Sequence, residues 1–193
     1  MIDPLILVRA VHYAATALAA GTVSFRVLAA GPYLPAGRNA FDRASRWLVW
    51  GGLLAAAASG AIWLIWLASD IYDASFIHVC LHGGAWSVLN GTRFGEVLIA
   101  RLALALVLGG LLSWPATRWL QLAIAAALIG SLALIGHAGA TPNGAGRLHL
   151  VSDMAHLLAA AAWVGGLPAL ALLLHQTRRE PGHAGAAVRR FST

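Results

Sequence analysis

Three polar residues, His149, Asp153 and His156, open the last apolar segment of the chain. Offsets of four and seven residues place their side chains on one face of an α-helix. Ionisable groups at the head of a membrane span are costly there and are by default candidates for function. Imidazole suits copper, zinc, iron and nickel, while Asp153 could bind the metal or orient a neighbouring histidine.

Two further histidines lie at a similar depth in other apolar segments. At ~1.5 Å of rise per residue, His12 lies roughly 10 Å into the first segment and His156 roughly 10 Å into the last, from the same side. His137 closes the fourth segment on that side. This convergence favours a metal site in the outer half of a helical bundle. The alternative is that each histidine hydrogen-bonds to a neighbouring helix, as polar side chains in bundles often do.

A weaker candidate for metal binding is the trio His78, Cys80 and His82 in the long second connection. In an extended strand the three side chains share one face and offer nitrogen and sulfur ligands that suit Cu(I). In a helix they do not share a face. An interfacial loop without a metal is the alternative interpretation.

Two residues are candidates to support the site. Arg101 lies one to two turns inside the third segment, where an unpaired charge is costly. It can snorkel toward Glu96, pair with Asp153, or take part in the site. Trp163 lies seven residues beyond His156 on the same helical face, and we expect it to pack or to form a lid beneath the site.

The composition is that of an integral membrane protein. Of 193 residues, 60% are hydrophobic and only 10% are charged, and the mean hydropathy is +0.75; a soluble domain is about one quarter charged. Each apolar stretch approaches or exceeds the ~20 residues that a transmembrane helix needs, and none alternates as barrel strands do. We therefore predict an all-α, polytopic bundle of about five spans, near residues 5–30, 47–69, 97–114, 117–137 and 149–174.

The positive charge predicts the topology rather than a nucleic-acid partner. The formal net charge of +6 comes from arginine alone. Four arginines flank the first connection, Arg118 lies in the third, and four more follow the last span, so the positive-inside rule predicts that these parts are cytoplasmic. The N-terminus is then outside and the C-terminus inside.

We expect one transmembrane domain over residues 1–193, with a short amphipathic helix or re-entrant piece at the outer interface between Ser69 and Gly95. The first span lacks a basic leading region and is too long for a signal peptide. A single cysteine excludes an intramolecular disulfide.

Several of these patches, kept in order along the chain, resemble the CopD (PcoD) family of bacterial inner-membrane copper-resistance proteins. The similar stretches are Arg9-Ala-Val-His12-Tyr13, Thr92-Arg-Phe-Gly95 with Arg101, Gly136-His137-Ala138, His149 to Gly166, and Arg189-Arg-Phe-Ser192.

The resemblance implies a multi-pass protein that moves copper across the inner membrane, with a periplasmic copper-binding partner of the CopC type. Carried over position by position, it implies His12, His137, His149 and His156 as ligand candidates. The family usually has about eight spans, and the Arg-Arg-Phe-Ser run usually introduces another. We therefore expect this chain to be partial, and such a part could bind copper without transporting it.

Two other functions are open at this stage. A b-type haem electron-transfer protein could hold its iron between histidines of neighbouring helices, with His12 and His156 the natural pair. A structural membrane subunit would use its histidines only to bond helices. An enzyme is least expected, because the sequence has no nucleophile elbow, P-loop or paired carboxylates at catalytic spacing.

Overall fold

The computed structural model describes residues 3–30, 38–135 and 144–176, and beyond them 185, 188, 189, 191 and 192. All regular structure in these residues is helical. The elements are α1 (Pro4–Ser24), the π-helix η1 (Phe25–Ala29), α2 (Arg38–Tyr72), α3 (Phe76–Leu81), α4 (Gly84–Gly91), α5 (Arg93–Leu111), the 3₁₀ turn η3 (Pro115–Thr117), α6 (Arg118–Gly130), the 3₁₀ turn η4 (Ser131–Leu134), α7 (Gly144–Trp163) and α8 (Leu167–Gln176).

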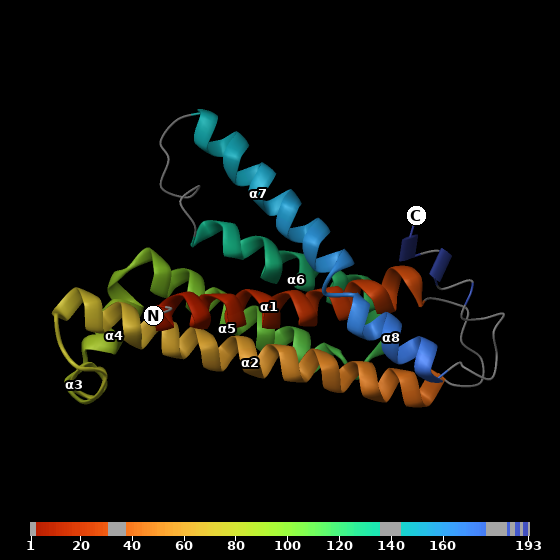
Figure 1. Cartoon of the computed structure of the whole chain (residues 1–193), viewed down its shortest axis with the longest axis horizontal. Helices are drawn as coiled ribbons and strands as arrows, with labels where there is room; N and C mark the ends of the chain where they lie inside the picture. The colour runs from red at the N-terminus through yellow and green to blue at the C-terminus, as the bar shows by residue number, and fades with distance from the viewer. Residues whose placement is uncertain are drawn as a thin grey trace.

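The prediction of a helical bundle with about five spans is confirmed. Among the described residues, five segments are long and apolar enough to cross a membrane: Pro4–Ala29, Ala40–Tyr72, Arg93–Leu111, Pro115–Leu134 and Gly146–Gln176. Successive segments run in opposite directions (Figure 1). We call the end of the bundle at which α1, α5 and α7 begin the His12 end. At the opposite end, called the Arg118 end, α2 and α6 begin.

Local signals fix where the spans at the His12 end start. Asp3 caps α1 by accepting the Leu5 N–H at 2.9 Å, and Pro4 occupies the first helical position, where its missing N–H costs nothing. Thr92 caps α5 by accepting the Gly95 N–H at 3.2 Å, and its hydroxyl also donates to the Val88 carbonyl at 2.7 Å. Thr92 therefore joins the end of α4 to the start of α5.

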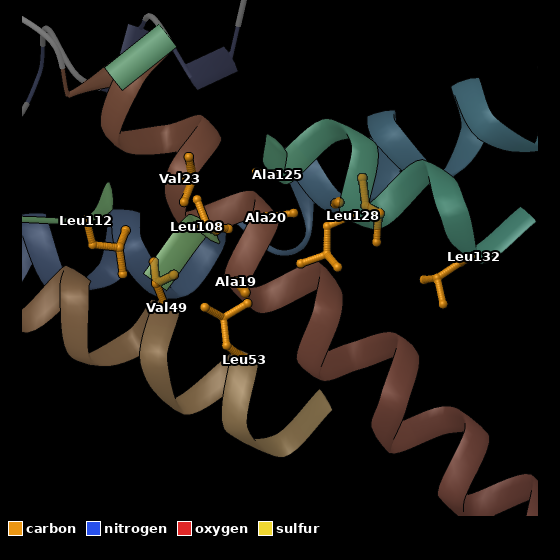
Figure 2. Close-up of a cluster of buried hydrophobic side chains, with 12 residues drawn as sticks. Ala19, Ala20, Val23, Val49, Leu53, Leu108, Leu112, Ala125, Leu128 and Leu132 are labelled. Atoms are coloured by element: carbon orange, nitrogen blue, oxygen red, sulfur yellow. The ribbon is translucent and has the colours of Figure 1, made fainter. Parts of the chain in front are cut away.

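The bundle core is built largely from small and aliphatic side chains of α1, α2, α5 and α6. Figure 2 shows this cluster, in which Ala19, Val49, Leu108, Ala125 and Leu132 are fully buried. Alanines and glycines let the helices approach closely, as membrane packing requires. A Cβ added at Gly52 of α2 would lie 2.8 Å from the Ala15 carbonyl oxygen of α1.

The last span is broken, which the sequence analysis did not anticipate when it predicted one run over 149–174. Helix α7 ends at Trp163 and α8 begins at Leu167. At the break, the Gly165 backbone lies against the Ala17 carbonyl of α1, in space that any side chain would fill. Pro168 follows in the first turn of α8, where it is tolerated because that turn needs no N–H donor.

The first part of α7 leans away from the rest of the bundle (Figure 1). From Arg147 to Ala160 no side chain is fully buried, and Ala161 is the first that is. Helix α7 therefore joins the bundle near its end, where it crosses α1, and leaves its first turns open.

The connection after α2 contains two short helices, α3 and α4, at the His12 end. They present exposed apolar side chains, with Ile77, Leu81 and Trp86 each more than two-thirds exposed, over the buried Val79 and Val88. This amphipathic pattern suits a segment at the membrane surface, as expected from the sequence.

Candidate functional site

His12 lies in the interior of the bundle, only 2% exposed, where α1 faces α2 and α5. Its Nδ1 is 2.9 Å from the Ala56 carbonyl oxygen and 3.2 Å from the Ser59 hydroxyl. Its Nε2 is 3.0 Å from an Arg101 guanidinium nitrogen. Both ring nitrogens are therefore occupied by protein groups.

Arg101 turns inward instead of snorkelling toward Glu96, so that expectation is wrong. The side chain is 3% exposed and donates to four acceptors on three helical segments. Its Nη1 donates to the Leu128 carbonyl and the Ser131 hydroxyl, both at 2.7 Å, and its Nη2 donates to His12 Nε2 and to the Thr16 hydroxyl, both at 3.0 Å. All four acceptors are neutral in this arrangement, and Nε has no partner among the described residues.

The Arg101 guanidinium determines which ring nitrogen of His12 carries the proton. A guanidinium can only donate, so the Nε2 facing Arg101 must carry a lone pair. The ring proton is then on Nδ1 and is donated to the Ala56 carbonyl. His12 is thus a neutral imidazole whose Nε2 lone pair, the one that a metal would use, is held by Arg101.

Aromatic rings enclose this network toward the His12 end. Trp63 lies edge-on to His12, with ring centroids 5.7 Å apart, and packs on Phe94 at 5.0 Å. The guanidinium of Arg9 lies over the Trp63 ring, 5.1 Å from the ring centroid. The edge-on Trp63 ring, with Phe94 tilted against it, therefore covers His12 on this side.

Sequence patches that lie far apart along the chain meet at this site. The Arg9-to-Tyr13 stretch supplies Arg9 and His12. The Thr92-to-Gly95 stretch supplies the Thr92 cap, the Phe94 contact, and a glycine at position 95 whose missing side chain makes room for the α4 backbone at Leu89. Arg101 follows two turns later. These stretches build one structural unit.

The residues of α7 lie apart from this network. His149 Nε2 is 3.9 Å from an Asp153 carboxylate oxygen, and the two side chains are 61% and 42% exposed. His156 is exposed as well. Trp163, expected to pack or to form a lid, is 65% exposed and does not fill the bundle interior.

The His78, Cys80 and His82 stretch is helical, so the extended arrangement in which all three share a face is not present. The rings of His78 and His82 stack with centroids 4.0 Å apart, and His82 Nδ1 donates to the His78 carbonyl at 3.0 Å. Cys80 is exposed, two residues from either histidine. His78 and His82 thus lie together as a histidine pair, and the Cys80 thiol lies on another face of α3.

A shared ligand set of His12, His137, His149 and His156 stays a prediction. His137 lies outside the described residues. Within the described part of the chain, no three His, Cys, Asp or Glu side chains gather closely enough to hold one ion.

Sequence reasoning missed four side chains of the network: Thr16, Ser59, Trp63 and Ser131. One of them carried a usable signal, because Thr16 follows His12 by four residues and therefore shares its helical face. The acceptors Ala56 and Leu128 act through their backbone carbonyls, which no residue type reveals.

Comparison with known protein families matches residues 1–147 to copper resistance protein D-like, N-terminal domain. The chain belongs to this family. The matched range includes His12, the Thr92-to-Gly95 stretch, Arg101 and His137, and it ends before His149. No curated protein and no solved structure matches the chain. This copper resistance D-like chain is therefore a multi-pass membrane protein related to copper resistance.

Proposed function

We propose that this copper resistance D-like protein binds copper at the His12 end of its bundle and passes it inward across a bacterial inner membrane. The observation that carries the proposal is the buried His12–Arg101 pair, a neutral imidazole whose Nε2 lone pair faces a guanidinium inside a protein of a copper-resistance family. Imidazole is a favourable copper ligand in either oxidation state.

Arg101 gives this site a closed state. Its positive charge sits beside the Nε2 lone pair, so a cation can bind His12 only after the guanidinium moves away. A fixed positive charge in a membrane pathway also repels other cations. In the proposed mechanism, copper coordination replaces the Arg101 hydrogen bond, and the pathway stays shut to cations that bind imidazole weakly.

The exposed residues of α7 supply the first contact with copper in this proposal. His149, Asp153 and His156 stand at the same end as His12 and offer nitrogen and oxygen ligands to an arriving ion. The stacked His78 and His82 on α3 offer a second outer pair. The positive-inside rule puts this end in the periplasm, where a CopC-type protein would deliver the metal.

The test measures copper uptake into proteoliposomes together with copper bound per purified protein. The triple variant His12→Ala, His137→Ala and His156→Ala is compared with His175→Ala, which removes an exposed histidine of α8 near the other end. We expect at least a tenfold loss of uptake in the triple variant and no change in the control. Unchanged uptake and copper content in a folded triple variant would refute the proposal.

The same preparations separate the other candidate functions. A Soret band that disappears in His12→Ala would identify a haem protein instead. Arg101 occupies the same His12 nitrogen whether the metal is haem iron or copper, so the spectrum decides between them. Absence of stoichiometric metal from wild-type protein would favour a structural subunit.

A further inference from the structure

A cavity of about 550 Å³ opens at the Arg118 end, away from His12. Its wall includes three arginines, Arg26, Arg46 and Arg118, against one carboxylate, Asp42. The remaining lining is mostly apolar and comes from η1, the start of α2, the end of α5, η3 and the start of α6. The volume falls within the range of small-ligand sites, and the charge of the wall is positive.

The three arginines that line this space come from separate elements. Arg26 belongs to the π-helix η1, a local irregularity that often occurs at functional sites. Arg46 comes from the first turns of α2, and Arg118 is the first residue of α6. Arg46 and Arg26 repel each other electrostatically, and Asp42 attracts Arg26. Arg26 and Arg46 thus lie close enough to interact although their charges are alike.

One nitrogen of these groups has no hydrogen-bond acceptor in the part of the chain that the structure describes. The Nη1 of Arg26 is buried and has no hydrogen-bond acceptor among the described residues. A buried N–H without an acceptor is unfavourable. If the Arg26 side chain turns toward the cavity, an anion there can accept from this nitrogen, and the anion would also relieve the repulsion between Arg26 and Arg46.

Hydrogen bonds of Gln121, another lining residue, join two of the elements around the cavity. Gln121 is buried, and its side-chain amide donates to the carbonyls of Leu111 and Trp114 and to the Thr117 hydroxyl, at 2.8, 3.1 and 3.0 Å. These bonds tie the end of α5 to the turn before α6. They fix the position from which Arg118 approaches the cavity.

We infer that this cavity is a binding site for a phosphate group. Planar guanidinium groups match phosphate oxygens and hold them through paired hydrogen bonds. Three strongly exposed tryptophans flank the cavity along the chain: Trp47 at 72%, Trp114 at 63% and Trp119 at 59%. Exposed tryptophans mark the headgroup level of a membrane, so the phosphate of an anionic phospholipid is the nearest source and free phosphate is the other.

Native mass spectrometry of the purified full chain tests the site. Phosphatidylglycerol, phosphatidylcholine and inorganic phosphate are titrated separately. We expect phosphatidylglycerol to bind at least tenfold more tightly than phosphatidylcholine. The double variant Arg46→Gln and Arg118→Gln should weaken phosphatidylglycerol binding about 25-fold, or about fivefold for each arginine.

Arg43→Gln is the matched control, because Arg43 is exposed on the same helix as Arg46 and does not line the cavity. It should change the affinity less than twofold. Saturable binding of inorganic phosphate that the double variant abolishes, with no preference for phosphatidylglycerol, would keep the phosphate site and assign it to the free anion. The inference would be wrong if the protein bound both lipids equally, bound no inorganic phosphate, and kept the same lipid affinities in the double variant. That conclusion would hold whatever the outcome of the copper experiments.

Discussion

At the scale of single residues, the central feature is a buried cation held by neutral acceptors. Arg101 has no carboxylate partner in the part of the chain described, and instead divides its donors between His12, Thr16, Leu128 and Ser131. An arginine inside a membrane helix is costly, and each acceptor lowers that cost. The network is thus needed to stabilise the buried charge of Arg101, and it is also the candidate gate of the metal site.

A double-mutant cycle measures how His12 and Arg101 depend on each other. His12→Ala should lower the free energy of unfolding by about 1.5–3 kcal/mol, because a charged donor loses its acceptor. In the double variant His12→Ala and Arg101→Met the stranded charge is gone as well. We expect this variant to be more stable than the sum of the single effects predicts, by about 1–3 kcal/mol.

Unfolding of the detergent-solubilised protein, followed by its tryptophan fluorescence, gives these energies. The pair His12→Ala and Arg93→Met is the control, since Arg93 is exposed at the start of α5. In this control pair, the changes in the free energy of unfolding caused by the two single substitutions should add. Additive effects for His12 and Arg101 too would show that the hydrogen bond between them contributes nothing to stability.

At the scale of elements, the position of the His12 ring depends on how closely α1, α2 and α5 pack. Gly60 of α2 lies directly against it: an added Cβ would be 3.1 Å from His12 Cε1 and 3.0 Å from Leu98 Cδ1. The glycine is therefore part of the site, although it carries no chemical group.

Two glycines of α2 make a matched test of this packing. A Cβ at Gly51 meets nothing within 4 Å, whereas one at Gly60 crowds two helices. Both changes to alanine gain similar helix propensity. We expect Gly51→Ala to be neutral or stabilising and Gly60→Ala to be less stable than Gly51→Ala by about 1–3 kcal/mol. Thermal unfolding checks the difference, and equal stabilities would mean that the His12 ring is not confined by α2.

At the scale of the whole molecule, hydropathy was enough to predict the five spans because lipid demands long apolar helices. Hydropathy predicted a second span over 47–69, whereas α2 continues from 38 to 72, because a helix need not end where the membrane does. It also missed the break at Gly165, because that break depends on the α1 backbone at Ala17. His12 and Arg101 were identified by their cost in lipid. Their contact was not, because it depends on the rotation of three helices and on carbonyl acceptors.

The orientation of the molecule, N-terminus outside and C-terminus inside, is a prediction from the arginines that the single cysteine can test. Cys80 is exposed on α3, at the His12 end. If this end faces the periplasm, a membrane-impermeant maleimide should label Cys80 in intact bacterial cells. In a Cys80→Ser background, Ser113→Cys places a thiol at an exposed position of the turn after α5, at the Arg118 end.

The second thiol should react only after the inner membrane is permeabilised, because the predicted topology keeps the arginine-rich end in the cytoplasm. The unmodified Cys80→Ser protein gives the background. The opposite labelling pattern would reverse the topology. It would place the His12–Arg101 network in the cytoplasmic half of the membrane, and the proposed delivery of copper from a periplasmic partner would then fail.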